Sequence, residues 1–165
     1  MIEALGLFEA HLTVPDLDVS LQFYRDVVGL PVAHVTPDRR AVFLWIGSAG
    51  TSMLGLWANH SPVNTVSHAA FRVSIADALA APAALRAAGV TPLDFDGRPT
   101  DLPVVLAWMP AAAVYFRDPA GHLLEYLAML PHAPRPEDGV VSWPAWLRLH
   151  GPATIGRSTP QVHTS

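Results

Sequence analysis

Three residues of metal-binding type, His11, His68 and Glu125, each lie within an apolar, strand-like stretch of the sequence. Imidazole nitrogens and carboxylate oxygens bind divalent iron, manganese, nickel or zinc, and three such ligands leave coordination positions open for a substrate. The 165 residues include no cysteine, so nitrogen and oxygen must hold any metal. Because the three residues lie far apart in the chain, they form one site only if the fold brings them together.

Strand and helix signals follow one another in the order βαβββ from residue 7 to residue 57. Residues 7–14 alternate as in a strand, with Glu9, His11 and Thr13 on one side. A helix is predicted over residues 19–28, because Asp16 or Asp18 can cap its start and Gly29 can end it. Strands are then predicted over residues 31–35, 41–46 and 52–57, with turns at 37–38 and 47–50.

The same order of signals recurs after a linker at residues 59–65. A strand over 68–73 and a helix over 75–88 precede strands near 91–95, 104–109, 113–117 and 122–129. Two matching halves predict a duplicated α+β domain at residues 1–130. We expect a first module at about residues 5–58, a second at about 66–130, and a proline-rich C-terminal extension at 131–165.

The repeat supplies an internal alignment in which His11 corresponds to His68, since each lies in the opening strand of its half. Matching the turn glycines Gly50 and Gly121 then makes Leu54 the counterpart of Glu125. Two-fold symmetry would turn all four positions inward, which gives three metal ligands and one leucine. On its strand, Glu125 shares a face with leucines, where a carboxylate is costly unless it is paired, protonated or bound to metal.

Other roles for the same residues stay open. A strand histidine is more often a satisfied core residue than a ligand, and Glu125 could instead pair with Arg72 or Arg117. His122 is expected in solvent at a turn. The remaining histidines are expected on the surface: His34, His60, His132, His150 and His163.

The segments HLTVPDLDVSLQFYRDVVGL, SHAAFRV and VYFRDPAGHLLEYL resemble the vicinal oxygen chelate superfamily over roughly residues 7–129. This superfamily includes glyoxalase I, fosfomycin resistance proteins, extradiol dioxygenases and bleomycin resistance proteins. The resemblance implies two βαβββ modules that form an incomplete barrel around one divalent metal, often in a homodimer. It assigns the metal positions to His11, His68 and Glu125.

The resemblance also implies a reaction class. A small substrate would bind the metal through vicinal oxygens, and the metal would act as a Lewis acid in lyase, isomerase or dioxygenase chemistry. Thr13 and Tyr115 are further candidates beside the metal, because fosfomycin resistance proteins share the HLT opening and extradiol dioxygenases have a tyrosine ten residues before the glutamate. Candidate walls of the substrate pocket are Phe43, Trp45, Trp57 and Trp108.

Differences between this sequence and the individual subfamilies narrow the choice of subfamily and reaction. Glyoxalase I usually has a carboxylate where the internal alignment places Leu54. The stretch WMPAAAVYF lacks the hydroxyl groups that fosfomycin resistance proteins use to hold potassium. The alternative function is that of a bleomycin-resistance-like protein, which sequesters a small molecule between subunits without a catalytic metal.

Composition limits the partners. The chain is 51% hydrophobic and 15% charged, with a net charge of −4, so it has no basic surface for nucleic acid. No apolar run reaches the roughly 18 residues that span a bilayer. We therefore expect a cytoplasmic protein without membrane contacts.

The C-terminal extension contains a short apolar cluster that includes Trp143 and Trp146. This cluster could dock on the barrel, cover the pocket or pack against a partner chain. Residues 151–165 are polar enough to be loosely held.

Overall fold

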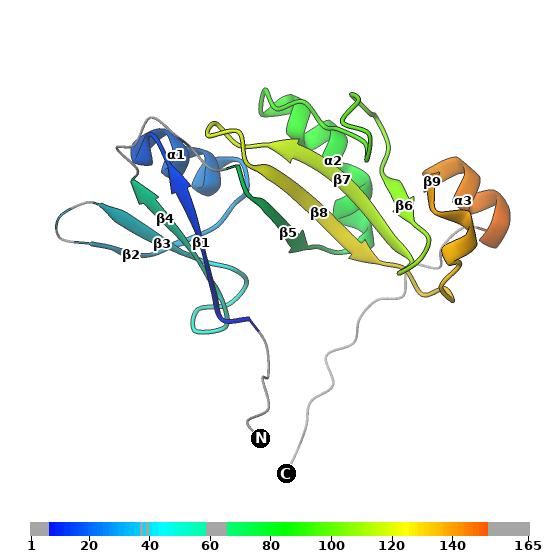
Figure 1. Ribbon diagram of the computed structural model, residues 1–165, viewed down its shortest axis with the longest axis horizontal. Helices are drawn as coiled ribbons and strands as arrows, with labels where there is room; N and C mark the ends of the chain where they lie inside the picture. Colours follow the sequence, from blue (N-terminus) through cyan, green and yellow to red (C-terminus); the bar gives the residue numbers. More distant parts are fainter. Residues whose placement is uncertain (1–6, 37, 39, 59–65, 152–165) are drawn as a thin grey trace, which may run out of the picture. The chain divides into compact units, whose positions relative to one another are not determined.

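The computed structural model describes residues 7–36, 38, 40–58 and 66–151. The first five elements are β1 (Glu9–Val14), α1 (Leu17–Asp26), β2 (Val32–Val35), β3 (Ala41–Trp45) and β4 (Met53–Ala58) (Figure 1). The next five are β5 (His68–Arg72), α2 (Ile75–Ala87), β6 (Val104–Leu106), β7 (Ala111–Arg117) and β8 (Leu123–Met129). The extension adds a 3₁₀ turn η1 (Pro136–Asp138), β9 (Val140–Ser142) and α3 (Trp143–His150). The order confirms the predicted α+β class with two βαβββ modules.

The chain forms two compact units, which are described separately. Unit 1 contains Met1–Ala69, Ala88–Val90 and Phe116–Leu124. Unit 2 contains Ala70–Ala87, Thr91–Tyr115 and Glu125–Ser165.

The sheet of unit 1 has the strand order β1-β4-β3-β2, with β1 parallel to β4 and the other neighbours antiparallel. Helix α1 contacts β3 and β4, and Leu44, Leu54 and Leu56 are buried. Asp16 caps the helix by accepting a hydrogen bond from the Val19 amide. The opposite face of this sheet carries Glu9 and His11.

Three residues of the segments that resemble the superfamily, Tyr24, Asp118 and His122, hold the turn before β8 within unit 1. The Tyr24 hydroxyl donates to Asp118 Oδ2 at 2.9 Å, and the His122 amide donates to Asp118 Oδ1 at 2.8 Å. His122 Nδ1 accepts from the Ser67 amide at 3.0 Å, so its Nε2 carries the hydrogen and donates to the Thr13 carbonyl at 3.0 Å. His122 is 0% exposed, so its predicted place in solvent is wrong.

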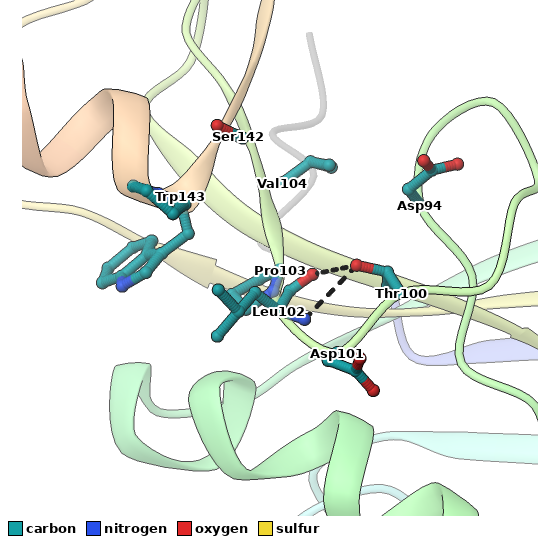
Figure 2. Close-up of a pocket in the computed structure, with 9 residues that line it drawn as sticks. Asp94, Thr100, Asp101, Leu102, Pro103, Val104, Ser142 and Trp143 are labelled. Carbon is teal, nitrogen blue, oxygen red and sulfur yellow. Dashed lines mark hydrogen bonds between the residues drawn. The ribbon is translucent and has the colours of Figure 1, made fainter.

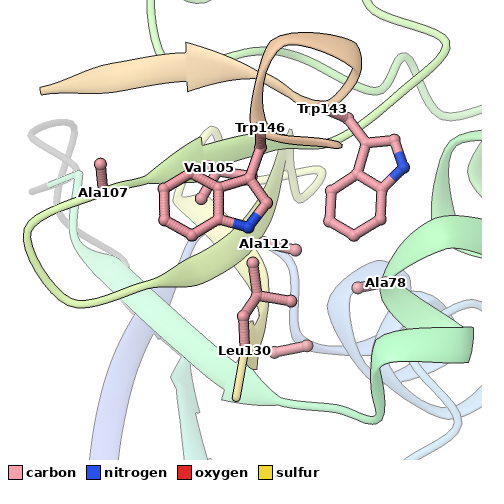
Figure 3. Close-up of a cluster of buried hydrophobic side chains, with 8 residues drawn as sticks. Ala78, Val105, Ala107, Ala112, Leu130, Trp143 and Trp146 are labelled. Atoms are coloured by element: carbon pink, nitrogen blue, oxygen red, sulfur yellow. The ribbon is translucent and has the colours of Figure 1, made fainter. Parts of the chain in front are cut away.

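The second sheet has the order β5-β8-β7-β6-β9, and its last strand comes from the C-terminal extension. Strand β9 pairs antiparallel with β6, and Ser142 caps α3 by accepting from the Ala145 amide. Trp146 is 0% exposed and Trp143 is also buried. Figure 3 shows both indoles within the apolar cluster of unit 2, together with Ala78, Val105, Ala112 and Leu130. The structure therefore places the tryptophans against the second module, the first of the three alternatives.

The predicted strand over residues 91–95 does not form. Leu93 makes isolated bridges to Tyr115 and to Pro99. Pro92 has no amide hydrogen to donate, and the chain turns back at once through a bond from the Gly97 amide to the Asp94 carbonyl. Several expectations fall outside the described residues: Pro37 of the first predicted turn, the linker at 59–65, His60, His163 and the tail at 152–165.

Candidate functional site

His11 lies over a glycine on the open face of the first sheet. In the parallel pair of β1 and β4, His11 is the partner of Gly55, and partners in a ladder point to the same side. A Cβ added to Gly55 would be 2.5 Å from His11 Cδ2 and 3.1 Å from His11 Nε2. The imidazole therefore occupies the space that a side chain at position 55 would need.

Leu54 is not the inward counterpart of Glu125, contrary to the internal alignment. Leu54 pairs with Ala10, the residue before His11, so its side chain lies on the opposite face of the sheet from the imidazole. There it is 1% exposed. The alignment on turn glycines fails because β4 begins three residues after Gly50, whereas β8 begins two residues after Gly121. A shift of one residue moves a side chain to the other face of its sheet.

A carboxylate and two aromatic rings surround His11. Its Nε2 lies 3.1 Å from Glu9 Oε1, and the two side chains are 47% and 34% exposed. The ring centroids of Phe43 and Trp57 lie 5.9 Å and 5.6 Å from that of His11. The β3–β4 register places Trp45 on the same face, opposite Met53. Three of the predicted wall residues thus share a face with His11.

Two backbone hydrogen bonds set the register of β5 and β8. The Leu123 amide donates to the Ser67 carbonyl, and the Val73 amide donates to the Leu127 carbonyl, each at 2.9 Å. In a parallel pair these bonds make His68 the partner of Leu123 and Ala70 the partner of Glu125.

Glu125 is buried in contact with Tyr115. The two residues are 5% and 7% exposed. Burial raises the pKa of Tyr115 above its usual range, and the charge of Glu125 and the hydrogen bond to it raise that pKa further. The tyrosine hydroxyl therefore stays protonated at neutral pH and donates to the carboxylate.

The other predicted residues have separate environments. Thr13 is exposed, and its carbonyl contacts His122. Trp108 is 56% exposed in the turn between β6 and β7. Two aromatic contacts were not predicted from sequence: His34 with Phe43, and Phe95 with Tyr115, at centroid distances of 6.3 Å and 6.2 Å. The spacing of residues in the sequence did not mark His34 or Phe95 as part of a functional site.

The structure therefore groups His11 with Phe43 and Trp57, and Tyr115 with Glu125. Within residues 7–36, 38, 40–58 and 66–151, no three histidine, aspartate or glutamate side chains gather closely enough to hold a metal ion. The predicted triad of His11, His68 and Glu125 stays a prediction.

Comparison with known families decides the affiliation. A model of the glyoxalase/bleomycin resistance protein/dioxygenase superfamily matches residues 6–126. The chain belongs to this superfamily.

Solved structures in and around the superfamily share the fold. An integron cassette protein from the mobile metagenome of a Halifax Harbour sewage outfall is 32% identical, with a TM-score of 0.66 over 76% of this chain and 100% of that one. Lactoylglutathione lyase from Agrobacterium tumefaciens is 23% identical, with a TM-score of 0.59 over 76% and 94% of the two chains. The oxidase ChaP-H2 is 23% identical, with a TM-score of 0.62 over 81% and 100%. A comparison with proteins of curated function gave no match.

Each unit contains nitrogen or oxygen donors of the kind that bind divalent metals, which the superfamily often uses. Glu9 and His11 offer oxygen and nitrogen on one sheet face, and Glu125 offers a carboxylate oriented by a hydroxyl. Gly55 leaves room for the imidazole. Among the described helices, none is long and apolar enough to cross a membrane.

A separate pocket of about 310 Å³ lies in unit 2, beside the C-terminal extension (Figure 2). Its polar groups already serve the fold. Arg86 bridges to Asp101 at 2.6 Å, and Thr100 Oγ1 donates to the Leu102 carbonyl at 2.7 Å. Ser142 caps α3. These polar side chains of the pocket are therefore engaged within the fold and are not free to react with a ligand.

Proposed function

We propose that this chain is a divalent-metal-dependent enzyme with lyase, isomerase or dioxygenase chemistry. Its substrate is a small molecule that binds the metal through two vicinal oxygens. His11, His68 and Glu125 hold the metal in this proposal. The bound ion supplies Lewis-acid stabilisation of negative charge on a substrate oxygen.

The observation that carries the proposal is the buried pair of Glu125 and Tyr115. A carboxylate that is 5% exposed on a strand face with Leu123 and Leu127 is costly to bury and needs strong partners. Tyr115 supplies one partner, because its raised pKa keeps the hydroxyl protonated as a donor. Carboxylates that bind metals are commonly oriented by such hydrogen bonds.

The residues around His11 favour a substrate with an apolar part. Phe43 and Trp57 flank the imidazole, and Trp57 is 40% exposed. A ring or alkyl group packed on these rings would lose contact with water, and the flanking rings would restrict rotation of the imidazole. The chain has no cysteine, so thiolate nucleophilic catalysis is not part of the proposal.

The second candidate is a ligand-sequestering protein without a catalytic metal. The exposed aromatic face of the first sheet favours it, as does the absence of three gathered metal ligands within the described part of the chain. The two candidates differ in their need for metal.

Elemental analysis after reconstitution with iron, manganese, nickel or zinc separates them. We expect one metal ion per chain for the wild type and loss of that metal in His68→Ala and Glu125→Ala. His34→Ala is the matched control, because His34 is exposed on β2 and is not a proposed ligand. A wild-type protein that takes up none of the four metals would exclude the enzyme.

Oxygen consumption then separates the reaction types. Uptake of oxygen with catechols after ferrous reconstitution would identify a dioxygenase. Turnover of a small oxygen-rich substrate without oxygen uptake would identify a lyase or isomerase.

The superfamily resemblance also leads us to propose a homodimer. Sedimentation velocity on the full chain would test this. A monomer at all concentrations would refute it.

A further inference from the structure

Strand β1 is the edge of the first sheet, so half of its backbone groups face away from the ladder with β4. The Met53 amide donates to the Phe8 carbonyl at 2.7 Å, so alternate residues from Phe8 onward direct their backbone groups towards β4. The backbone groups of His11 and Thr13 point outward, where they need other partners. The Thr13 carbonyl accepts from Nε2 of the buried His122 ring at 3.0 Å.

The same ring holds the backbone directly before β5. The Ser67 amide donates to His122 Nδ1 at 3.0 Å, and the Ser67 carbonyl accepts from the Leu123 amide at 2.9 Å. Both backbone groups of Ser67 are therefore engaged within unit 1, and His68 follows directly in the chain. Strands β1 and β5 belong to different sheets, so no ladder among the described strands sets their spacing. The His122 ring joins β1 to the start of β5.

The turn that carries His122 is itself held in place. The His122 amide donates to Asp118 Oδ1 at 2.8 Å, and the His122 carbonyl accepts from the Asp118 amide at 3.1 Å. The Tyr24 hydroxyl on α1 donates to Asp118 Oδ2 at 2.9 Å. All three residues are buried, so a shift of the ring would leave buried polar groups without partners. The turn thereby fixes the ring relative to α1.

We propose that His122 is a positioning residue for the two histidines of the candidate metal site. Its ring holds the backbone of His11 and the backbone of His68 at one separation, so that both imidazoles can reach the same ion. Thr13 lies two residues after His11, about 7 Å along the strand, and Ser67 is bonded directly to His68. The inference rests on the proposed metal-dependent function, and His122 contacts neither metal nor substrate in it.

The chemistry of the link supports this role. An apolar side chain could fill the same buried space, but it could not accept a hydrogen bond from one segment and donate one to another. The imidazole of His122 does both, in the tautomer that carries its hydrogen on Nε2. Hydrogen bonds of this kind commonly fix the elements on which metal ligands stand.

Amide hydrogen exchange on the full-length apoprotein measures the link without any metal. The Ser67 amide should exchange slowly in the wild type, because it donates to the buried ring. His122→Ala should accelerate that exchange by about tenfold or more, whereas the Met53 amide in the β1–β4 ladder should keep its rate. Unchanged exchange at Ser67 would show that the ring does not hold this backbone, and would overturn the proposal.

Cobalt binding, measured by calorimetry, tests what the link does for the two histidines. We expect His122→Ala to bind Co²⁺ at least about tenfold more weakly than the wild type, because His11 and His68 are no longer held at one separation. Trp146→Ala is the matched control, since it removes a buried ring from the core of unit 2 and should bind Co²⁺ as the wild type does. Equal weakening in both variants would assign the effect to lost stability and refute the positioning role.

His122→Asn separates the two halves of the link, and it serves as the test if the alanine variant does not fold. Its amide oxygen can lie near the position of Nδ1 and accept from Ser67, but the shorter side chain does not reach the Thr13 carbonyl. We expect slow exchange at Ser67 together with weakened Co²⁺ binding. Wild-type affinity in this variant would show that the bond to Thr13 is not needed, and would overturn the proposal.

The outcomes separate this inference from the proposed function. If the wild type binds no Co²⁺, both fail. If His11→Ala and His68→Ala weaken binding while His122→Ala binds as the wild type does, the metal enzyme stands and the positioning role is refuted.

Discussion

At the scale of single residues, His122 shows that part of the superfamily signature serves the fold. It is completely buried and joins the Ser67 amide to the Thr13 carbonyl within unit 1. We predict that His122→Ala lowers the free energy of unfolding by about 3 kcal/mol, because it removes a buried ring and leaves the part-buried Ser67 amide and Thr13 carbonyl without this partner. Urea denaturation measures this loss.

The exposed His34 provides the comparison. His34→Ala should change the free energy of unfolding by no more than about 0.5 kcal/mol. If the two variants were equally stable, His122 would not be the structural link that its hydrogen bonds indicate.

The candidate site was predictable only in part, because the pattern of one strand is ambiguous. Glu9 and His11 are two residues apart and lie on the same face, so alternation indicates the face but not which residue corresponds to His68. The ladder between β1 and β4 places His11 beside Gly55, a pairing between residues remote in sequence that alternation along one strand cannot reveal. The burial of His122 was missed because its partners are similarly remote in sequence.

At the scale of elements, α3 and β9 complete the core of unit 2. We predict that Trp146→Ala lowers the free energy of unfolding by about 3–5 kcal/mol, because it leaves a large cavity beside Val105 and Leu130. Thermal and urea denaturation measure the effect. Leu149→Ala on the same helix is the control, since Leu149 is 54% exposed and its loss should cost less than about 0.5 kcal/mol.

The stability that the packing of α3 contributes should also depend on pH. Trp146 Nε1 donates to His132 Nδ1 at 3.3 Å, which requires His132 to be unprotonated at that nitrogen. Burial lowers the pKa of His132, and the charge of nearby His150 lowers it further. As pH falls through about 6.5, the unfolded chain takes up this proton before the folded chain does, so stability falls.

Melting temperature measured between about pH 5 and pH 8 tests this response. His132→Asn keeps an acceptor near the indole but does not titrate, so it should flatten the pH dependence of the melting temperature. Asp138 and His150 also influence the region, and both are retained in this variant. An unchanged slope in His132→Asn would assign the response to another group.

Local signals explain why most elements were predicted correctly. Helix α1 begins after the Asp16 cap and ends at Asp26, two residues before the predicted end, and α2 begins at the predicted Ile75. The strand predicted near residue 93 failed because short apolar runs do not reveal whether a neighbouring strand is available for pairing. Strand β9 was missed for the same reason: its partner β6 lies far away in sequence.

At the scale of the whole molecule, all three tyrosines sit where ionisation is unfavourable. Burial raises the pKa of Tyr126 to about 12. Burial raises the pKa of Tyr24 and Tyr115 above the usual range as well, and the neighbouring carboxylates Asp118 and Glu125 add to the effect. We predict that no tyrosine of the native protein ionises near pH 10.

Ultraviolet absorbance of tyrosinate during an alkaline titration measures this. In the unfolded chain all three tyrosines should titrate near pH 10. The unfolded state therefore loses protons that the folded state retains, and stability should decline as pH rises above about 10. A native tyrosine that titrated at its ordinary pKa would show that its side chain is not buried as described.

Gly55 constrains which residues can accompany His11. Any larger side chain at position 55 would collide with the imidazole, because an added Cβ already comes within 2.5 Å of His11 Cδ2. Loss of the imidazole would remove this constraint. A side chain at position 55 is therefore expected among close relatives only where position 11 is no longer histidine.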